Sequence, residues 1–173
     1  MNSSDKDAVN GASLRMRPAS RALILSHDNS ALFVRFEFST GVFWALPGGG
    51  KEGNETYEQA LVRELTEEVG LEDPHIGPII WTRKQLVPNF GKYDGQSEQI
   101  FLVKVPSRFE PAPSMSWEEL RAENVFEIRW WSLTELYEAT ENSEVKWIPQ
   151  DLPRLVIDII ENGPPSRPLP IGL

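Results

Sequence analysis

The chain has 173 residues, enough for one domain with a sizeable hydrophobic core. Its 26 acidic and 17 basic side chains give a net charge of −9, which argues against a basic surface that binds nucleic-acid polymers. Because the chain has no cysteine, disulfides, thiolate nucleophiles and cysteine-based metal sites are excluded. No apolar run approaches the roughly 20 residues of a membrane span, and residues 1–12 lack the apolar stretch of a signal peptide, so we expect a cytoplasmic location.

Composition divides the chain into three parts. Residues 1–17 are rich in Ser, Asn and Asp and predict a disordered leader, residues 18–161 carry the apolar patterns of a folded domain, and residues 162–173 form a Pro-rich, extended tail. At the start of the domain, alternating apolar and aromatic residues predict strands at 20–25, 31–38 and 42–46. A loop is predicted at 47–54.

A helix with well-marked ends follows this loop. Thr56 and Gln59 have the spacing of a capping box, in which each residue satisfies the other's backbone N–H. Gly70 matches the left-handed glycine that ends many helices. The helix is therefore predicted at 57–69.

Three carboxylates share one face of this helix. At helical spacing Glu64, Glu67 and Glu68 fall within an arc of about 100°, beside an arc of apolar residues that reads as the buried face. Like charges at this spacing repel each other and weaken a helix. A hard divalent cation with oxygen ligands, Mg²⁺ or Mn²⁺, is the simplest partner for such a cluster.

The second half of the domain alternates strands with helices. Strands are predicted at 76–86, 98–105 and 126–131, with a polar loop at 87–97 and a long excursion at 106–123. Helices are predicted at 133–140, after Ser132 as the N-cap, and at 152–161. Strands interleaved with about three helices predict an α/β fold with a mixed β-sheet between helices.

The stretch Gly49–Leu71 resembles the signature of the Nudix hydrolase family, and we refer to it as the box. The signature is Gly, five residues, Glu, seven residues, Arg-Glu, an aliphatic, any residue, Glu-Glu, any residue, Gly and an aliphatic. Every specified position matches, at Gly49, Glu55, Arg63, Glu64, Leu65, Glu67, Glu68, Gly70 and Leu71. The resemblance implies a Nudix-type α/β/α sandwich with the box helix beside the site, and it extends to residues 127–133, which resemble the family's closing strand and following helix.

The resemblance also implies an activity, which is Mg²⁺-dependent cleavage of the pyrophosphate bond in a nucleoside diphosphate linked to another group. Divalent ions suit this chemistry because they neutralise phosphates and acidify a bound water. The implied metal ligands, which are also the catalytic carboxylates, are Glu64, Glu67 and Glu68, with the backbone carbonyl of Gly48. Arg63 is implied to pair with box carboxylates such as Glu55 and to hold their geometry.

The substrate contacts and the general base are less well defined by the sequence. Gly49 lets the backbone approach a phosphate closely, and Arg35 and Lys51 are candidate phosphate contacts, although each also reads as ordinary surface charge. The base is either Glu64 or a later carboxylate, and the options are Glu98, Glu118, Glu119, Glu123 and Glu127. Glu123 precedes the closing strand, where some family members place a further metal-binding Glu. Base-stacking candidates are Trp44, Trp81, Phe90, Tyr93 and Trp117, of which Phe90 and Tyr93 stand in a polar loop.

Several alternatives stay open at this point. The substrate is a small nucleotide, either a nucleoside triphosphate or an ADP-ribose or sugar-nucleotide type; Pro88, seventeen residues after Leu71, is one residue from the spacing of some ADP-ribose enzymes. A nucleotide-binding sensor that does not cleave its ligand is the alternative from another class, and a structural module with a coincidental box is a third. The resemblance further implies a homodimer.

Overall fold

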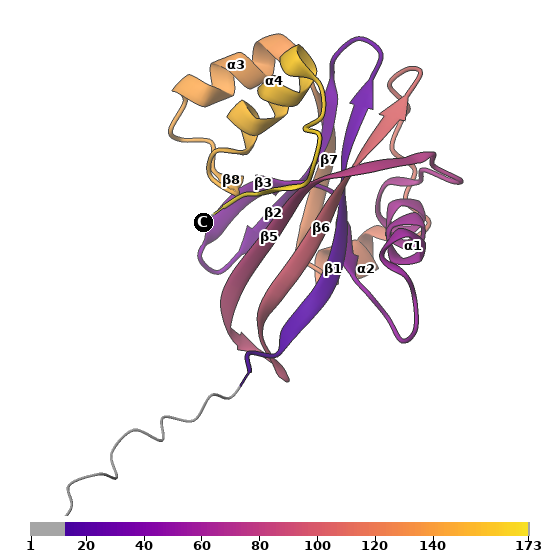
Figure 1. The fold of residues 1–173 in the computed structure, drawn as a ribbon, viewed down its shortest axis with the longest axis vertical. Coiled ribbons are helices and arrows are strands. Elements are labelled where there is room, and N and C mark those ends of the chain that lie inside the picture. The colour runs from indigo at the N-terminus through magenta and orange to yellow at the C-terminus, as the bar shows by residue number, and fades with distance from the viewer. Residues whose placement is uncertain (1–12, 173) are drawn as a thin grey trace, which may run out of the picture.

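In the computed structural model, which describes residues 13–172, a single mixed sheet runs through the molecule with helices on both faces (Figure 1). Within this range the strands are β1 (Met16–Ser26), β2 (Ala31–Phe38), β3 (Gly41–Ala45), β4 (Gly48–Gly50), β5 (Ile76–Phe90), β6 (Tyr93–Val105), β7 (Val125–Trp131), β8 (Trp147–Ile148) and β9 (Leu169–Pro170). The helices are α1 (Tyr57–Val69), α2 (Trp117–Ala122), α3 (Leu133–Glu141) and α4 (Leu152–Asn162). The predicted α/β sandwich with a mixed sheet is confirmed.

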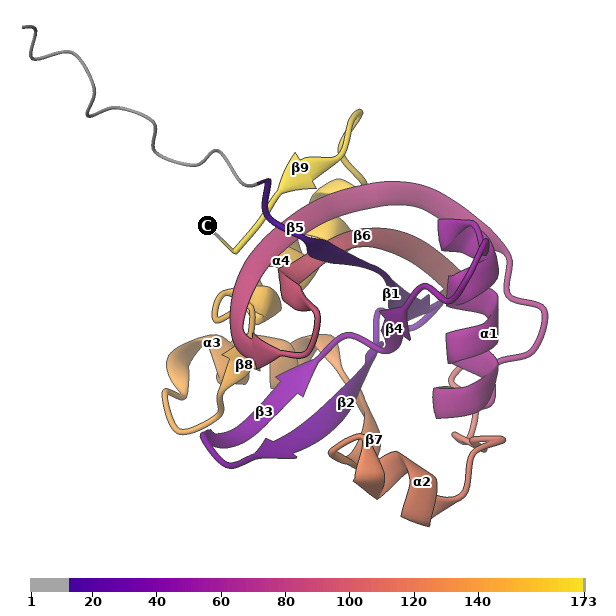
Figure 2. The same cartoon turned by 90° about the horizontal axis from the view of Figure 1, so that it is seen from below.

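The sheet is built around β1. The strand order is β8-β3-β2-β1-β6-β5-β9, with β4 also paired to β1 and β7 to β2. The longest pairing without a register shift is parallel, between β1 and β6, from Met16 opposite Gly95 to Ser26 opposite Val105. Figure 2 shows that β5 and β6 curve in a wide arc, so that the sheet is curled rather than flat. The curl leaves α1 near β1 and β4, with α3 and α4 on the other side of the sheet.

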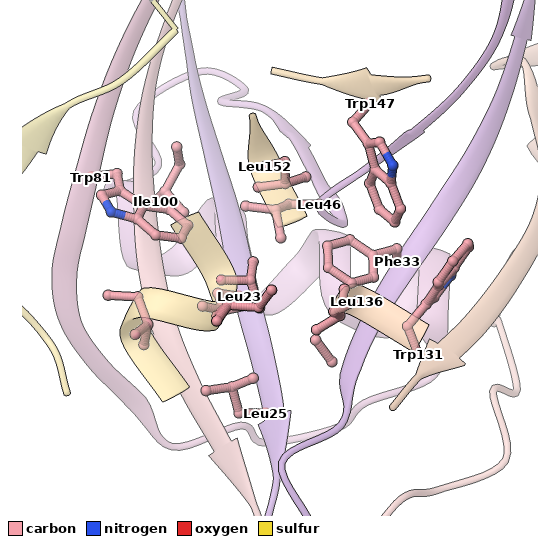
Figure 3. Close-up of a cluster of buried hydrophobic side chains, with 14 of the residues drawn as sticks. Leu23, Leu25, Phe33, Leu46, Trp81, Ile100, Trp131, Leu136, Trp147 and Leu152 are labelled. Atoms are coloured by element: carbon pink, nitrogen blue, oxygen red, sulfur yellow. The ribbon is translucent and has the colours of Figure 1, made fainter. Parts of the chain in front are cut away.

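Alternation along β1 divides the buried side chains between two cores. Ala22 and Ile24 face α1 and α2, whereas Leu23 and Leu25 face α3 and α4. Figure 3 shows the second core, in which Leu23 and Phe33 lie among the side chains of the C-terminal helices. Both faces of the sheet are therefore covered, as the uninterrupted apolar run 22–25 in β1 requires.

Several predicted boundaries are wrong. The loop predicted at 47–54 contains β4, and the excursion predicted at 106–123 contains α2. The polar segment at 87–97 predicts a loop, but β5 continues to Phe90 and β6 begins at Tyr93. Positive φ at Asn89 and Gly91 (58° and 59°) supplies the irregular backbone that closes this hairpin, so ladder pairing overrides the polar composition. The strand predicted to start at residue 20 starts at Met16, so the last residues assigned to the leader belong to the sheet; residues 1–12 lie outside the described range.

The Pro-rich tail covers an edge of the sheet. Its β9 pairs in parallel with β5, and the backbone N–H of Ile171 donates to the carbonyl oxygen of Thr82 at 2.9 Å. The Ile171 side chain is 6% exposed and belongs to the core under α3 and α4. Across residues 13–172 no helix has the length and apolar character needed to cross a membrane.

Candidate active site

Helix α1 begins and ends where its caps predict. The Thr56 side chain accepts from the backbone N–H of Gln59, the Gln59 side chain accepts from the backbone N–H of Thr56, and Gly70 ends the helix at φ +76°. Leu61 and Leu65 are fully buried against the sheet. These contacts fix the rotation of α1 and turn its carboxylate face toward β4.

Arg63 lies at the centre of a charged cluster that we call the box network, made of Arg63, Glu55, Glu64, Glu67 and the Gly50 carbonyl. Its Nε and Nη2 donate to the two Glu55 oxygens at 2.7 and 3.1 Å, which is the bidentate pair expected from the sequence. Nη1 donates to Glu64 at 2.9 Å and to Glu67 at 3.2 Å, and Nη2 also donates to the Gly50 carbonyl at 3.0 Å. One guanidinium therefore holds three carboxylates and the loop in a single arrangement.

The glycines of β4 bring the loop against this helix. The backbone N–H of Gly48 donates to Glu68 at 3.1 Å, and Gly48 has a φ of +133°, a conformation that favours glycine. A Cβ added at Gly49 would overlap the Glu64 carboxylate, and one added at Gly48 would overlap the backbone of Ser20. Glycine is thus required here for close approach of the carboxylates to the strand.

Burial perturbs two of the box carboxylates. The pKa of Glu68 is raised to about 8, mainly by burial and to a smaller extent by the charges of Glu64 and Glu123, against the opposing effects of Arg21 and Gly48. Burial also raises the pKa of Glu64, while Arg63 opposes this effect. Conversely, hydrogen bonds from Arg63 lower the pKa of Glu55. A buried carboxylate whose ionised form is disfavoured is suited to a cation that would restore its charge.

The donor set fits a hard divalent ion, with one rearrangement. Each of Glu64, Glu67 and Glu68 uses one oxygen inside the protein, and within residues 13–172 no hydrogen bond reaches the other oxygen of any of the three. In the same range, however, no three acidic, histidine or cysteine side chains converge closely enough to hold an ion as they stand. Small side-chain rotations away from Arg63 would therefore accompany ion binding, and oxygen-only ligands suit Mg²⁺ or Mn²⁺.

A second charged cluster, the sheet network, lies behind the loop and consists of Arg21, Glu98, Arg83 and Gln96. Arg21 Nε donates to Glu98 at 2.5 Å, Arg83 Nη1 donates to the other Glu98 oxygen at 3.1 Å, and Gln96 adds a third donor at 2.7 Å. Burial alone would raise the pKa of Glu98, but the two arginines outweigh it and lower that pKa.

The sheet network supports the loop directly. Arg21 Nη1 donates to the carbonyl oxygens of Leu46 and Gly48 at 2.9 and 3.3 Å. The Gly48 peptide is consequently held from both sides, by Arg21 at its carbonyl and by Glu68 at its N–H. Sequence reasoning missed Arg21 and Arg83, because the β1–β6 pairing brings Arg21 to Glu98 and the β5–β6 pairing brings Arg83 to it.

The structure narrows the options for the base. Glu98 is committed to two arginines, Glu119 caps α2 through Ser116, and Glu127 pairs with Arg35. Glu118 is exposed on α2. Glu123 is the later carboxylate whose negative charge raises the pKa of both Glu64 and Glu68, which places it near the box.

The two side chains predicted to contact phosphate differ in whether they already form ion pairs. The Arg35 guanidinium is engaged by Glu127 at 2.8 Å and by Glu37, so it already has two anionic partners. Lys51 follows β4 directly, and its Nζ lies 4.7 Å from the centre of the Tyr57 ring at the start of α1. Lys51 is therefore beside the box, with no ion pair within residues 13–172.

The aromatic residues predicted as base-stacking candidates differ in how deeply they are buried. Trp44 and Trp81 are 7% and 2% exposed and belong to the core, whereas Trp117 is exposed on α2. Phe90 and Tyr93 face each other at the end of the β5–β6 hairpin, with ring centres 6.3 Å apart, and both are half-buried. They are the aromatic candidates that combine partial exposure with proximity to each other.

Comparison with known proteins decides the family. The NUDIX domain profile matches residues 15–151, which is most of the chain. The chain belongs to the Nudix family. Among curated relatives, a nucleoside triphosphatase NudI from Enterobacter sp. is 36% identical over 85 residues, covering 46% of this chain and 59% of the relative. An RNA pyrophosphohydrolase from Wolbachia pipientis is 29% identical over 98 residues, covering 47% and 56%. The chain thus spans somewhat more than half the length of these relatives.

Solved structures share the fold of this Nudix chain. The NUDIX domain of Shewanella oneidensis NrtR, complexed with ADP ribose, has a TM-score of 0.61 at 16% identity and covers 87% of this chain and 90% of that domain. A MutT NUDIX hydrolase from Burkholderia pseudomallei has a TM-score of 0.58 at 17% identity and covers 83% and 97%. At these identities the similarity shows the fold alone.

Proposed function

We propose that this Nudix protein is a hydrolase that uses a divalent metal ion to cleave the pyrophosphate bond of a nucleoside diphosphate linked to another group. The observation that carries the proposal is the unbroken box, with Glu64, Glu67 and Glu68 on a capped helix and one oxygen of each left without a donor in the described chain. The partial relatives named nucleoside triphosphatase and RNA pyrophosphohydrolase agree with this reaction class.

The protein's part in the reaction is to bind and orient. Glu64, Glu67 and Glu68, with the Gly48 carbonyl, would hold Mg²⁺ or Mn²⁺. Such an ion, when bound, neutralises phosphate charge and lowers the pKa of a bound water. The bidentate pair with Glu55 fixes both the distance and the direction of the Arg63 guanidinium. Arg63 can therefore hold the box carboxylates in a fixed orientation relative to the loop.

A further carboxylate completes the proposed site. Glu123 lies close enough to Glu64 and Glu68 to raise both pKa values, and it is free of the partners that occupy Glu98 and Glu127. We assign Glu123 to the additional metal ligand or the general base that takes the proton of the attacking water. The net charge of −9 favours a small nucleotide over a long polymer as substrate.

The test is turnover across a panel of nucleoside triphosphates, ADP-ribose, sugar nucleotides, dinucleotides and a 5′-triphosphorylated RNA, with Mg²⁺ or Mn²⁺. The wild type is compared with Glu67→Gln, whose side chain keeps its size but loses the charge. We expect a metal-dependent hit that falls at least about a hundredfold in the variant. Mn²⁺ should also raise the thermal unfolding midpoint of the wild type more than that of the variant, because an ion bound to the folded state stabilises it.

Two outcomes would count against the proposal. Wild-type activity in Glu67→Gln would remove the role of the box carboxylates. Nucleotide that binds to the wild type and is recovered intact, with excess Mg²⁺ present, would identify a sensor instead of an enzyme.

A further inference from the structure

The C-terminal segment 164–172, which we call the docked tail, is attached to the domain through few contacts. Residues 166–170 are all exposed, and within residues 13–172 no side-chain hydrogen bond or ion pair involves the docked tail. Ile171 is different, because its side chain is 6% exposed and belongs to the core under α3 and α4. The docked tail is therefore an exposed segment held by a single apolar anchor near its end.

The docked tail adds a short parallel strand to the edge of β5. In this pairing β9 stands opposite Trp81 and Thr82, and the backbone N–H of Ile171 donates to the Thr82 carbonyl oxygen at 2.9 Å (Figure 2). β5 has 15 residues and β9 has two, and in the described part of the chain no other strand pairs with this edge. Leu86, farther along β5, is 62% exposed. Addition of a strand to an exposed sheet edge is a common way to bind an extended peptide.

The end of the docked tail lies between two parts of the domain. A Cβ added at Gly172 would lie 3.0 Å from Nε of Arg83, which is on β5, and 3.2 Å from Pro149, which precedes α4. We call the edge of β5 at 81–83, together with Pro149, the β5 docking surface. It offers backbone groups for strand addition and, next to them, an apolar site that accepts one side chain.

So few contacts allow the docked tail to detach while the domain stays folded. Burial of one isoleucine side chain shifts an equilibrium only roughly ten- to hundredfold. The docked tail contains four prolines, at positions 164, 165, 168 and 170. Because proline fixes φ, the detached segment stays close to its extended conformation and can dock again at a small cost in entropy. Opening of such a segment is a local event, distinct from unfolding of the sheet.

We propose that the β5 docking surface binds an extended peptide segment of a partner protein, and that the docked tail occupies this surface in cis and restricts access to it. The docked tail defines the chemistry of the ligand, which is a proline-rich segment with one aliphatic anchor that adds to β5 in parallel. Because it is tethered, the docked tail competes at an effective concentration of about millimolar. A partner segment overcomes this competition by pairing with more of β5, along 83–90. The inference is independent of the proposed hydrolase activity.

The first measurement is amide hydrogen exchange in the wild type. The Ile171 amide should be protected only about ten- to hundredfold, because detachment of the docked tail is enough to expose it. The Leu102 amide lies in β6, between β1 and β5, and should exchange only when the domain unfolds. Equal protection of the two amides would overturn the proposal, because the docked tail would then detach only on global unfolding.

The second measurement is an NMR titration with an end-capped synthetic peptide that has the sequence of residues 164–172. Ile171→Asp in the full chain should release the docked tail, because an apolar site does not accept a carboxylate. This variant should bind the peptide at least about tenfold more tightly than the wild type, whose docking surface is occupied. The matched control is Leu169→Asp, since Leu169 is 43% exposed, and it should bind the peptide as weakly as the wild type. The same peptide with Asp in place of Ile171 should not bind.

Equal affinity of the wild type and Ile171→Asp for the peptide would overturn the proposal, as would equal binding of the two peptides. Sedimentation velocity on Ile171→Asp tests another occupant: a dimer that forms and excludes the peptide would show that a second copy fills the surface instead of a partner segment. If Ile171→Asp does not fold, the peptide is added to the wild type at millimolar concentration. It should then accelerate exchange of the Ile171 amide several-fold by trapping the detached tail, and an unchanged rate would overturn the proposal.

Discussion

The box network and the sheet network are both made of arginine and glutamate, but they differ in sequence span and in exposure. Arg63 reaches partners one, four and eight residues away, whereas Arg21 and Glu98 are 77 residues apart. The Glu67 side chain is 36% exposed and that of Glu98 is 2% exposed. The box network, which is partly exposed at Glu67, can exchange partners with an ion or a substrate, while the buried sheet network must remain paired. We therefore expect the first to control activity and the second to control stability.

The largest effect on stability is expected from Glu98→Gln. The variant leaves Arg21 and Arg83 buried without a counter-charge, which should lower the free energy of unfolding by about 3 kcal/mol. Urea unfolding measures this change. The control is Glu127→Gln, which breaks an Arg–Glu pair whose Glu side chain is 43% exposed and should cost less than about 1 kcal/mol. Equal losses in the two variants would show that the sheet network is no more than a surface pair.

The effect of Glu98 should also depend on pH. The folded protein has a lowered Glu98 pKa, so the stabilisation by the ionised carboxylate is complete above the unfolded value of about 4.3 and is lost as pH falls through the folded value. The difference in unfolding free energy between wild type and Glu98→Gln should thus be constant near neutral pH and shrink in acid. A difference that grows below pH 4 would contradict the lowered pKa.

The contrast between the networks also explains what the sequence could predict. Helix α1 appears at its predicted residues because its caps and its apolar face are local signals, and the Arg63–Glu55 pair is the one that the family resemblance implied. The hairpin from Phe90 to Tyr93 and the short strand β4 depend on pairing with distant strands, so their polar or glycine-rich sequences read as loop. Glu98 looked like a free carboxylate for the same reason.

The largest effect on activity outside the proposed metal ligands is expected from Arg63→Lys. Lysine keeps the charge but cannot make the bidentate contact with Glu55 while also reaching Glu64 and Glu67, so the carboxylates lose their common orientation. Turnover should fall about a hundredfold, as for a small misplacement of reacting groups, while the free energy of unfolding changes by less than about 1 kcal/mol.

Steady-state kinetics and urea unfolding on the same preparation separate these two quantities. Arg129→Lys is the control, because Arg129 pairs with Glu135 over Trp131, at the start of α3 and away from the box. It should keep wild-type turnover. An Arg63→Lys chain with full activity would mean that the box carboxylates hold their positions without the guanidinium. The expectation that the box network controls activity would then be wrong.

The smallest effect concerns the helix ends. Thr56 and Ser132 each form a complete capping box, Thr56 at the start of α1 beside the site and Ser132 at the start of α3 on the opposite face. Each Ala variant removes one cap acceptor, so each should lower the free energy of unfolding by about 1 kcal/mol. If both variants lose the same amount, the cap at α1 acts as a local device, and the loop at 51–55 is held by the box network. A much larger loss in Thr56→Ala would show instead that the cap, the loop and the Arg63 contacts form one cooperative unit, and that the box network contributes to stability as well as to activity.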